Sequence, residues 1–510
     1  MSWLRSVSCL AASLASLSCR RTPELQITGE AIRSLGEASE ETSPVFDGNA
    51  VHLRGARGET LGLQVHMAAG AHRAAALHLP PSAATVTGFA VGSLEVREPS
   101  TDLYGPSLGR GSYPDILFPE AEGTVPSAGL AYFDVAIPST ARPGVYGGEM
   151  TLNDRRVPVT LEVSRARIDL DHEPLVWAFY LPKEIARVHG IADDDSPASV
   201  AVERTYYDLF RSHGVMLAAD LPPARFAARQ SFVRDVRYWP VAVDISSDEA
   251  ITRDVHQWIA LFQGLATTPF AIPIDEPHTA AQRLRARHVA DVIGGAGGGR
   301  PRLLRGVTDA TDDVYGDAID VFISPKNIPG RSLEREHKGE RFWTYNGRPP
   351  EAGSMVLDAE GDALRTWGWI AYRYDVELWY AWEALYFSDR YNGGGPTDVM
   401  HDPITFDERR HRGTDWGNGD GLLAYPGPLP SLRLKALRRG LEDRLQLREL
   451  EACGGGAAAH RITQRLVPKA LSEGHGAAAW PSRESTWEDA RREILDAIEV
   501  SCHDDAQLDR

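Results

Sequence analysis

Short apolar runs that alternate with polar residues fill the first third of the chain. The runs "AVHLRGA", "TLGLQVHMAA", "LAYFDVAIP" and "VPVTLEV" follow this pattern, and Gly, Pro, Asn and Asp separate them at close spacing. Alternation is typical of strands with one buried face, and frequent turn residues favour antiparallel sheets. The pattern predicts a β-sandwich domain over residues 24–165.

The pattern changes near residue 168 to apolar strands that alternate with amphipathic helices. Strands are expected at 175–181, 215–219, 238–244, 270–275, 302–307, 319–324, 341–345 and 376–382. Helices are expected between several of them, at 197–213, 254–265, 280–293 and 363–374. Alternation of strands and helices indicates a parallel sheet, and eight strands predict a (β/α)8 barrel over residues 168–450. Barrels of this kind carry their chemistry at the C-terminal ends of the strands.

A helical period begins near the end of the predicted barrel. Ser431 is a favoured N-cap residue, and leucines recur at helical spacing after it: Leu434, Leu437, Leu441 and Leu445. We expect this leucine row to be core. Residues 451–510 are expected to form a helical C-terminal extension.

The first residues have the features of a secretory signal over residues 1–19. Arg5 precedes an apolar and small-residue segment, 7–17, which is too short to span a bilayer. The "LSC" that ends at Cys19 is typical of a bacterial lipoprotein signal, which predicts a lipid on Cys19. Ser16 stands where such signals usually have Leu, so plain cleavage is the alternative. Either way, the protein is expected in the cell envelope, the periplasm or the extracellular space.

Composition and missing motifs exclude several classes of function. The formal charge is −17, from 54 Lys and Arg against 71 Asp and Glu, and no basic run is long enough to bind a phosphate backbone, so nucleic acid is not an expected partner. No HExxH, CxxC or GxSxG motif occurs, and neither a metal nor a cofactor is expected. Two of the four cysteines, Cys453 and Cys502, remain after signal processing, and they either pair or stay separate thiols.

The segment "FAIPIDEPHT", residues 270–279, carries the chemistry. Asp275 and Glu276 follow an apolar run, and by strand order they fall at the C-terminal end of the fourth barrel strand. The alternative is that these acids only begin the next helix, where they would interact favourably with its dipole. Pro277 predicts an extended backbone at Glu276, with the two carboxylates pointing to different sides. Adjacent acids with different tasks suit substrate-assisted glycoside hydrolysis, in which a 2-acetamido group of the sugar is the nucleophile.

Aromatic residues cluster on the predicted barrel strands. They lie on the first strand (Trp177, Tyr180), the seventh (Trp343, Tyr345) and the eighth (Trp379, Tyr380, Trp382). Each one alone is more readily explained as core, because barrel strands bury large side chains. Together they predict a cavity that stacks on the apolar faces of sugar rings.

The sequence resembles glycoside hydrolase family 123 and the larger, mostly uncharacterised family related to it. The resemblance covers nearly all of the mature chain and is carried by "RGARGETLGLQVHM", "PIDEP", "DVFISP", "RFWTYNGRPP" and "NGDGLLAYPGPLPSLRLKALRRGLEDRLQLREL". Characterised members act on β-linked N-acetylgalactosamine with neighbouring Asp and Glu. The resemblance implies that Asp275 orients the acetamido group and that Glu276 is the general acid and then the general base. It also implies sugar contacts from Tyr345 and Asn346.

Three functions remain in competition at this point. The first is an exported glycosidase for β-linked 2-acetamido sugars, with Asp275 and Glu276 as its catalytic pair. The second pairs Glu276 with Glu383 as nucleophile, on sugars without an acetamido group. The third is a surface protein that binds carbohydrate without turnover. The expected partner is a glycan, with membrane contact only through a lipid at Cys19, and the expected substrate-binding residues are Trp177, Tyr180, Tyr345, Asn346, Trp379, Trp382 and Glu383.

Overall fold

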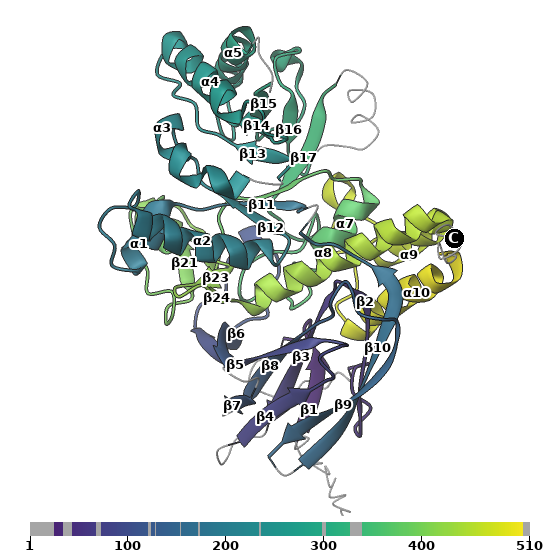
Figure 1. The fold of residues 1–510 in the computed structure, drawn as a ribbon. Helices are drawn as coiled ribbons and strands as arrows, with labels where there is room; N and C mark the ends of the chain where they lie inside the picture. The colour runs from purple at the N-terminus through teal and green to yellow at the C-terminus, as the bar shows by residue number, and fades with distance from the viewer. Residues whose placement is uncertain are drawn as a thin grey trace, which may run out of the picture.

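The structure is a computed structural model of the 510-residue chain. It describes residues 25–33, 43–67, 73–120, 124–127, 129–153, 155–171, 174–233, 236–297, 302–326 and 339–502. The predicted signal, with Cys19, lies outside these residues. Figure 1 shows two β-rich regions, with the long helix α8 (Leu432–Leu450) crossing the chain between them.

The N-terminal region consists of two five-stranded sheets, which confirms the prediction that it is β-rich. The first has the order β1 (Leu25–Gly29), β3 (Thr60–Met67), β8 (Leu130–Ala136), β5 (Thr85–Val96), β6 (Gly111–Glu120). The second has the order β2 (Val51–Arg57), β10 (Arg155–Arg167), β9 (Gly144–Leu152), β4 (Arg73–His78), β7 (Thr124–Ser127). Leu63 and Phe133 of the first sheet share one apolar core with Met150 and Leu161 of the second. The alternation in the sequence therefore reflects strands with one buried face.

The second region contains an eight-stranded parallel sheet that is nearly closed into a barrel. Its order is β12 (Val215–Ala218), β11 (Val176–Phe179), β18 (Trp379–Ala381), β17 (Arg341–Tyr345), β16 (Val321–Ile323), β15 (Leu304–Val307), β14 (Thr268–Ala271), β13 (Tyr238–Pro240). All eight predicted strands are present; β17 has the predicted bounds, and the other seven are shorter than predicted. Among the described residues no strand pairing joins β12 to β13, so hydrogen bonds do not close the barrel there.

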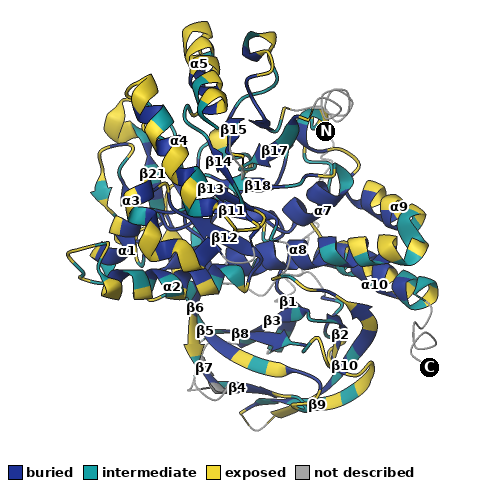
Figure 2. Ribbon diagram, turned by 45° about the horizontal axis from the view of Figure 1, so that its top comes forward, coloured by how far each residue is buried: buried dark blue, intermediate teal, exposed yellow. Residues whose placement is uncertain are grey.

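The helices between these strands begin at well-formed caps. The Ser196 hydroxyl accepts a hydrogen bond from the N–H of Ser199 at the start of α2, and the Ser247 hydroxyl accepts one from Ala250 at the start of α4. Thr279 and Gln282 form a capping box at α5. The helices of this region are α1 (Pro182–Val188), α2 (Pro197–Arg211), α3 (Pro223–Phe226), α4 (Asp248–Phe262), α5 (Ala280–Ala296) and α7 (Thr366–Arg373). The outward faces of α4 and α5 are exposed in Figure 2, as expected for helices that cover a barrel.

Helix α8 is buried along nearly its whole length, and it is dark blue in Figure 2. Ser431 caps it, and the predicted leucine row is core, with Leu434 and Leu437 fully buried. It packs closely on α7, because a Cβ added at Gly368 would lie 1.7 Å from the carbonyl oxygen of Gly440. Only glycine allows this approach of the two backbones.

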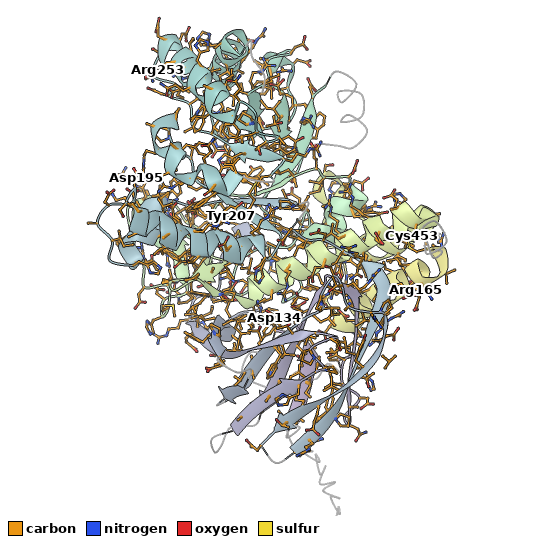
Figure 3. The ribbon with its side chains drawn as sticks, in the orientation of Figure 1. Asp134, Arg165, Asp195, Tyr207, Arg253 and Cys453 are labelled. Carbon is orange, nitrogen blue, oxygen red and sulfur yellow. A yellow bond between two sulfur atoms is a disulfide. The ribbon has the colours of Figure 1, made fainter. Side chains whose placement is uncertain are left out.

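The opposite face of α8 joins the two regions through buried ion pairs. Lys435 and Arg438 each reach Asp134 of β8 at 2.6 Å, and Asp134 lies between the sheets and α8 in Figure 3. Arg433 pairs with Asp115 of β6 at 2.9 Å. Removing one partner would leave a buried charge unpaired, so these contacts fix the N-terminal region firmly against the barrel.

Two further helices, α9 (Gly456–Leu466) and α10 (Glu484–Ser501), form the C-terminal extension beside α8. A disulfide joins Cys453, before α9, to Cys502, after α10. It decides between the two alternatives that the sequence left for these thiols. Among the described residues, no helix combines the length and the apolar composition that a membrane span needs.

Candidate active site

A cavity of about 740 Å³ opens at the C-terminal ends of the barrel strands. Strand ends and the loops after them contribute most of its lining: Trp177, Phe179, Asp220, Pro240, Val241, Ile272, Asp275, Glu276, Tyr345, Asn346, Tyr380 and Trp382. The predicted acid pair and most of the predicted aromatic residues therefore meet in one place. The N-terminal region adds Leu103 and Tyr104 to the lining.

Asp275 is held by a hydroxyl from the neighbouring strand. Thr308, directly after β15, donates a hydrogen bond to Asp275 Oδ1 at 2.6 Å. The cavity walls desolvate the Asp275 carboxyl and raise its pKa above the ordinary value. The Thr308 hydrogen bond opposes this rise, and the charge of Glu276 adds to it. The net result is that Asp275 holds its proton to a higher pH than an ordinary aspartate.

Glu276 is exposed, as Asp275 is, and 47% of its side chain surface is accessible. Its Oε1 accepts a hydrogen bond from the Tyr345 hydroxyl at 2.9 Å, and His278 Nε2 lies 3.8 Å from its Oε2. Tyr345 is the last residue of β17, three strands away from β14, so a different part of the barrel contacts the Glu276 carboxyl. The arrangement leaves room for a substrate oxygen beside the acid.

The predicted extended backbone at Glu276 is wrong. Its φ is +42°, in the left-handed region that residues with a side chain rarely adopt. The reason is tertiary: the N–H of Glu276 donates to Thr308 Oγ1 at 2.6 Å, and Tyr345 holds the other end of the residue. Strain of this kind costs about 1–3 kcal/mol and concentrates at functional sites.

Tyr345→Phe tests the contact to Glu276. Loss of a hydrogen bond to a charged group costs about 1.5–3 kcal/mol, so kcat/KM should fall by about 10- to 100-fold. The protein should still fold, because the ring is retained. Steady-state kinetics together with a melting curve check both expectations; an unchanged kcat/KM would show that Tyr345 does not hold Glu276 during turnover.

Aromatic rings form a large part of the cavity wall. Trp177 stacks on Tyr380 with ring centres 4.4 Å apart, and Tyr345 lies 6.4 Å from Tyr380. The main chain of Trp382 donates to Asn346 Oδ1 at 2.9 Å. Asn346 therefore lines the cavity and also fixes the position of Trp382. Such a wall suits the apolar face of a sugar ring.

Strand alternation separates the other predicted substrate-binding residues from the cavity. On β11, Trp177 and Phe179 line the cavity, whereas Tyr180 does not line it and donates to Glu203 at 2.7 Å. On β18 and just after it, Tyr380 and Trp382 line it, whereas Trp379 stacks on Trp367, 4.8 Å away. The predictions for Tyr180 and Trp379 fail because neighbouring residues of a strand face opposite sides.

Glu383 follows the same alternation and lies outside the cavity lining. Its side chain has no exposed surface and is paired with Arg390. A carboxylate in this position does not reach a sugar in the cavity. The prediction that Glu383 contacts substrate, as binding residue or nucleophile, is therefore contradicted by its burial.

Several polar residues of the site were not singled out from the sequence, among them Asp220, Thr308, Tyr104 and Asp420. Thr308 directly follows β15, and Asp220 lies two residues after β12. A polar residue just after a strand, as Asp275 is, was the signal that could have identified both. Burial raises the pKa of Asp220 as well. Tyr104 and Asp420 had no local signal, because they lie more than 300 residues apart and are bonded to each other.

Metal-binding residue types do not gather at the cavity in the described part of the chain. The one cluster of three such residues found there is Glu449, Cys453 and Cys502, and its two sulfur atoms are joined in the disulfide.

Comparison with known proteins relates this site to a family. Residues 306–450 match the family model of the glycoside hydrolase 123 catalytic domain. This segment is similar to the catalytic domain of the family 123 glycoside hydrolases. The matched segment includes Tyr345, Asn346, Trp382 and Asp420, whereas the acid pair precedes it. The match supports glycosidase activity.

A solved structure shares the fold of this chain. A family 123 glycoside hydrolase from Clostridium perfringens, studied for glycolipid glycan hydrolysis, has a TM-score of 0.66 and 13% identity over 93% of this chain and 98% of that one. A Bacteroides ovatus GH5 xyloglucanase has a TM-score of 0.26 and 9% identity over 76% of this chain and 98% of that one. A search of curated proteins finds no match.

Proposed function

We propose that the protein hydrolyses the glycosidic bond of a β-linked 2-acetamido sugar, with the acetamido group as nucleophile and retention of configuration. The observation that carries the proposal is the acid pair at the strand ends. Glu276 accepts a hydrogen bond from Tyr345, whereas Asp275 is desolvated and held by Thr308. Two adjacent carboxylates in different environments suit two different tasks.

The chemistry follows from these environments. Glu276 gives its proton to the leaving glycosidic oxygen while the acetamido carbonyl oxygen attacks the anomeric carbon. Asp275 accepts the acetamido N–H and stabilises the positive charge that develops on the cyclic intermediate. Glu276 then takes a proton from water. The water oxygen attacks the anomeric carbon, which opens the ring that the acetamido group had formed and restores that group. Because its charge is poorly solvated beforehand, Asp275 interacts most strongly when that positive charge forms.

The rival mechanism with Glu383 as nucleophile is disfavoured by the complete burial of Glu383. A matched pair of aryl glycosides separates the two. The protein should release the aryl alcohol from the 2-acetamido-β-galactoside about 100-fold faster than from the plain β-galactoside, because only the first carries the internal nucleophile. Equal rates on both glycosides would contradict the proposal, and binding of both without release would favour the non-catalytic alternative.

We also propose that the protein is exported, with residues 1–19 as its signal and a lipid on Cys19. The disulfide between Cys453 and Cys502 supports an oxidising compartment. Labelling of cells with a radioactive fatty acid should mark the wild-type protein and not the Cys19→Ala variant. Mature protein without label would instead indicate plain cleavage.

A further inference from the structure

Asp420 is a buried carboxylate in the cavity wall that the proposed mechanism does not use. Only 5% of it is exposed, and both of its oxygens accept hydrogen bonds from aromatic residues of the wall. Trp382 Nε1 donates to Oδ1 at 3.1 Å, and the Tyr104 hydroxyl donates to Oδ2 at 3.0 Å. Asp420 thus contacts both rings through hydrogen bonds.

The backbone around Asp420 is packed directly against these two rings. A Cβ at Gly417 would lie 2.7 Å from the Tyr104 ring, and a Cβ at Gly421 would lie 2.9 Å from Cζ2 of Trp382. Thr405 donates to the carbonyl of Asp420 at 2.7 Å, which fixes the segment. The carboxylate therefore has little freedom to turn away from its two donors.

Tyr104 reaches this place from the N-terminal region. It ends a short 3-10 helix, Asp102–Tyr104, between β5 and β6. The N–H of Thr101 donates to the carbonyl of Trp416 at 3.1 Å, four residues before Asp420. Leu103, which is 40% exposed, lines the cavity beside Tyr104. The contact between the N-terminal region and the segment before Asp420 therefore lies at the edge of the cavity.

We propose that Asp420 is a positioning residue that holds the Trp382 indole and the Tyr104 ring in place, so that residues 101–105 of the N-terminal region form part of the substrate-binding wall. The geometry of two rings on one buried carboxylate carries the inference. Only the nature of the ligand rests on the proposed function. Trp382 then presents a fixed face to the sugar, and substrate binding depends on a region outside the barrel.

The charges around this cluster determine how it responds to pH. Burial raises the pKa of Asp420 to about 6, and the Trp382 and Tyr104 hydrogen bonds and the Arg433 charge oppose the rise. The charges of Glu408 and Asp415 act on the Tyr104 side. Below this pKa the carboxyl is neutral and accepts weaker hydrogen bonds, so the hold on Trp382 should loosen in acid.

Fluorine NMR of protein labelled with 5-fluorotryptophan tests the inference without any substrate. The Trp382 resonance, assigned with Trp382→Phe, should shift with pH about a midpoint near 6. Asp420→Asn should move this resonance and abolish its titration, and Tyr104→Phe should move it as well. A Trp382 resonance that does not shift with pH, with Asp420→Asn or with Tyr104→Phe would overturn the proposal.

Asp362 provides a matched control. It is another buried carboxylate, its pKa is raised by burial to about 7, and it accepts a hydrogen bond from Trp487 Nε1 at 2.7 Å. Asp362→Asn should change the Trp487 resonance and leave that of Trp382 in place. If Asp420→Asn does not fold, the wild-type titration and Tyr104→Phe decide the question.

A kinetic measurement adds the functional consequence. Asp420→Asn should raise KM for the aryl 2-acetamido-β-galactoside about 10-fold with a smaller change in kcat, because the loss of uniform binding appears in KM. A fall in kcat at constant KM would instead assign Asp420 to the chemical step and overturn the positioning role. Failure of the wild type to cleave this substrate would refute the proposed function and leave the NMR result valid.

Discussion

Glu276→Gln should lower kcat/KM on a substrate with a poor leaving group by about 10²–10⁴-fold, the usual contribution of a general acid. The amide retains the size of the side chain and an acceptor for the Tyr345 hydroxyl, which donates to Glu276 at 2.9 Å. It has no proton of suitable acidity to give. A substrate with a good leaving group, such as a dinitrophenyl glycoside, should lose less in its first step, because that oxygen needs no proton. Steady-state kinetics on the two substrates measures both effects.

Glu249→Gln is the matched control for this change. Glu249 is an exposed glutamate in the first turn of α4 and does not line the cavity. It should keep wild-type rates on both substrates. If Glu276→Gln behaved like Glu249→Gln, the assignment of the general acid would be wrong.

Asp275→Asn should lower kcat on 2-acetamido substrates by about 10²–10³-fold, because it removes the charge that stabilises the intermediate. Added azide should not restore activity, since Asp275 does not form a covalent bond to the sugar. In the wild type, activity should fall in acid as Asp275 gains its proton, and the raised pKa places this fall above the usual range of an aspartate. Rapid azide rescue with formation of a glycosyl azide would instead identify a missing enzymatic nucleophile.

Asp275→Asn should lower activity but raise the stability of the folded protein. The folded-state pKa of Asp275 is raised, so its contribution to stability is fully present below the unfolded-state pKa and is lost as pH rises through the folded-state value. A neutral Asn avoids this loss, and Asp275→Asn should melt at a higher temperature than the wild type at pH 7. The difference should shrink toward pH 3. Melting curves at the two pH values show whether the site is held at a cost in stability.

Strand order was the part of the fold most accessible from the sequence. Strand segments such as "LVWAFYL" contain β-branched and aromatic residues between clear breaks, so their existence could be predicted while their ends could not. The predicted fourth strand runs to Asp275, whereas β14 ends at Ala271. The acids therefore lie in the loop after the strand, still at the working end of the barrel.

Domain limits were less accessible, because α8 contacts both regions. The limits at 24–165, 168–450 and 451–510 stay predictions. Helix α8 belongs by sequence to the barrel span, yet its buried cations pair with acids of the N-terminal sheets, as Lys435 does with Asp134. A contact between residues about 300 positions apart leaves no local pattern in the chain.

The candidate site could be predicted as far as local pattern reaches. Asp275, Glu276 and Tyr345 were placed by strand order and by a family resemblance, and the structure brings them together. The orientation of a residue on a short strand depends on register, so Tyr180 could not be told from Trp177. The backbone of Glu276 was decided by Thr308, a residue 32 positions away, against the preference of the dipeptide.

The central claim is that the acetamido group of the substrate is the nucleophile. A thiazoline analogue of the 2-acetamido sugar tests this claim directly. The analogue imitates the cyclic intermediate, so it should inhibit competitively with an inhibition constant about 10²-fold or more below the KM of the aryl glycoside. Asp275→Asn should lose most of this inhibition. Hydrolysis that proceeds unaffected by the thiazoline at concentrations above KM would contradict the account.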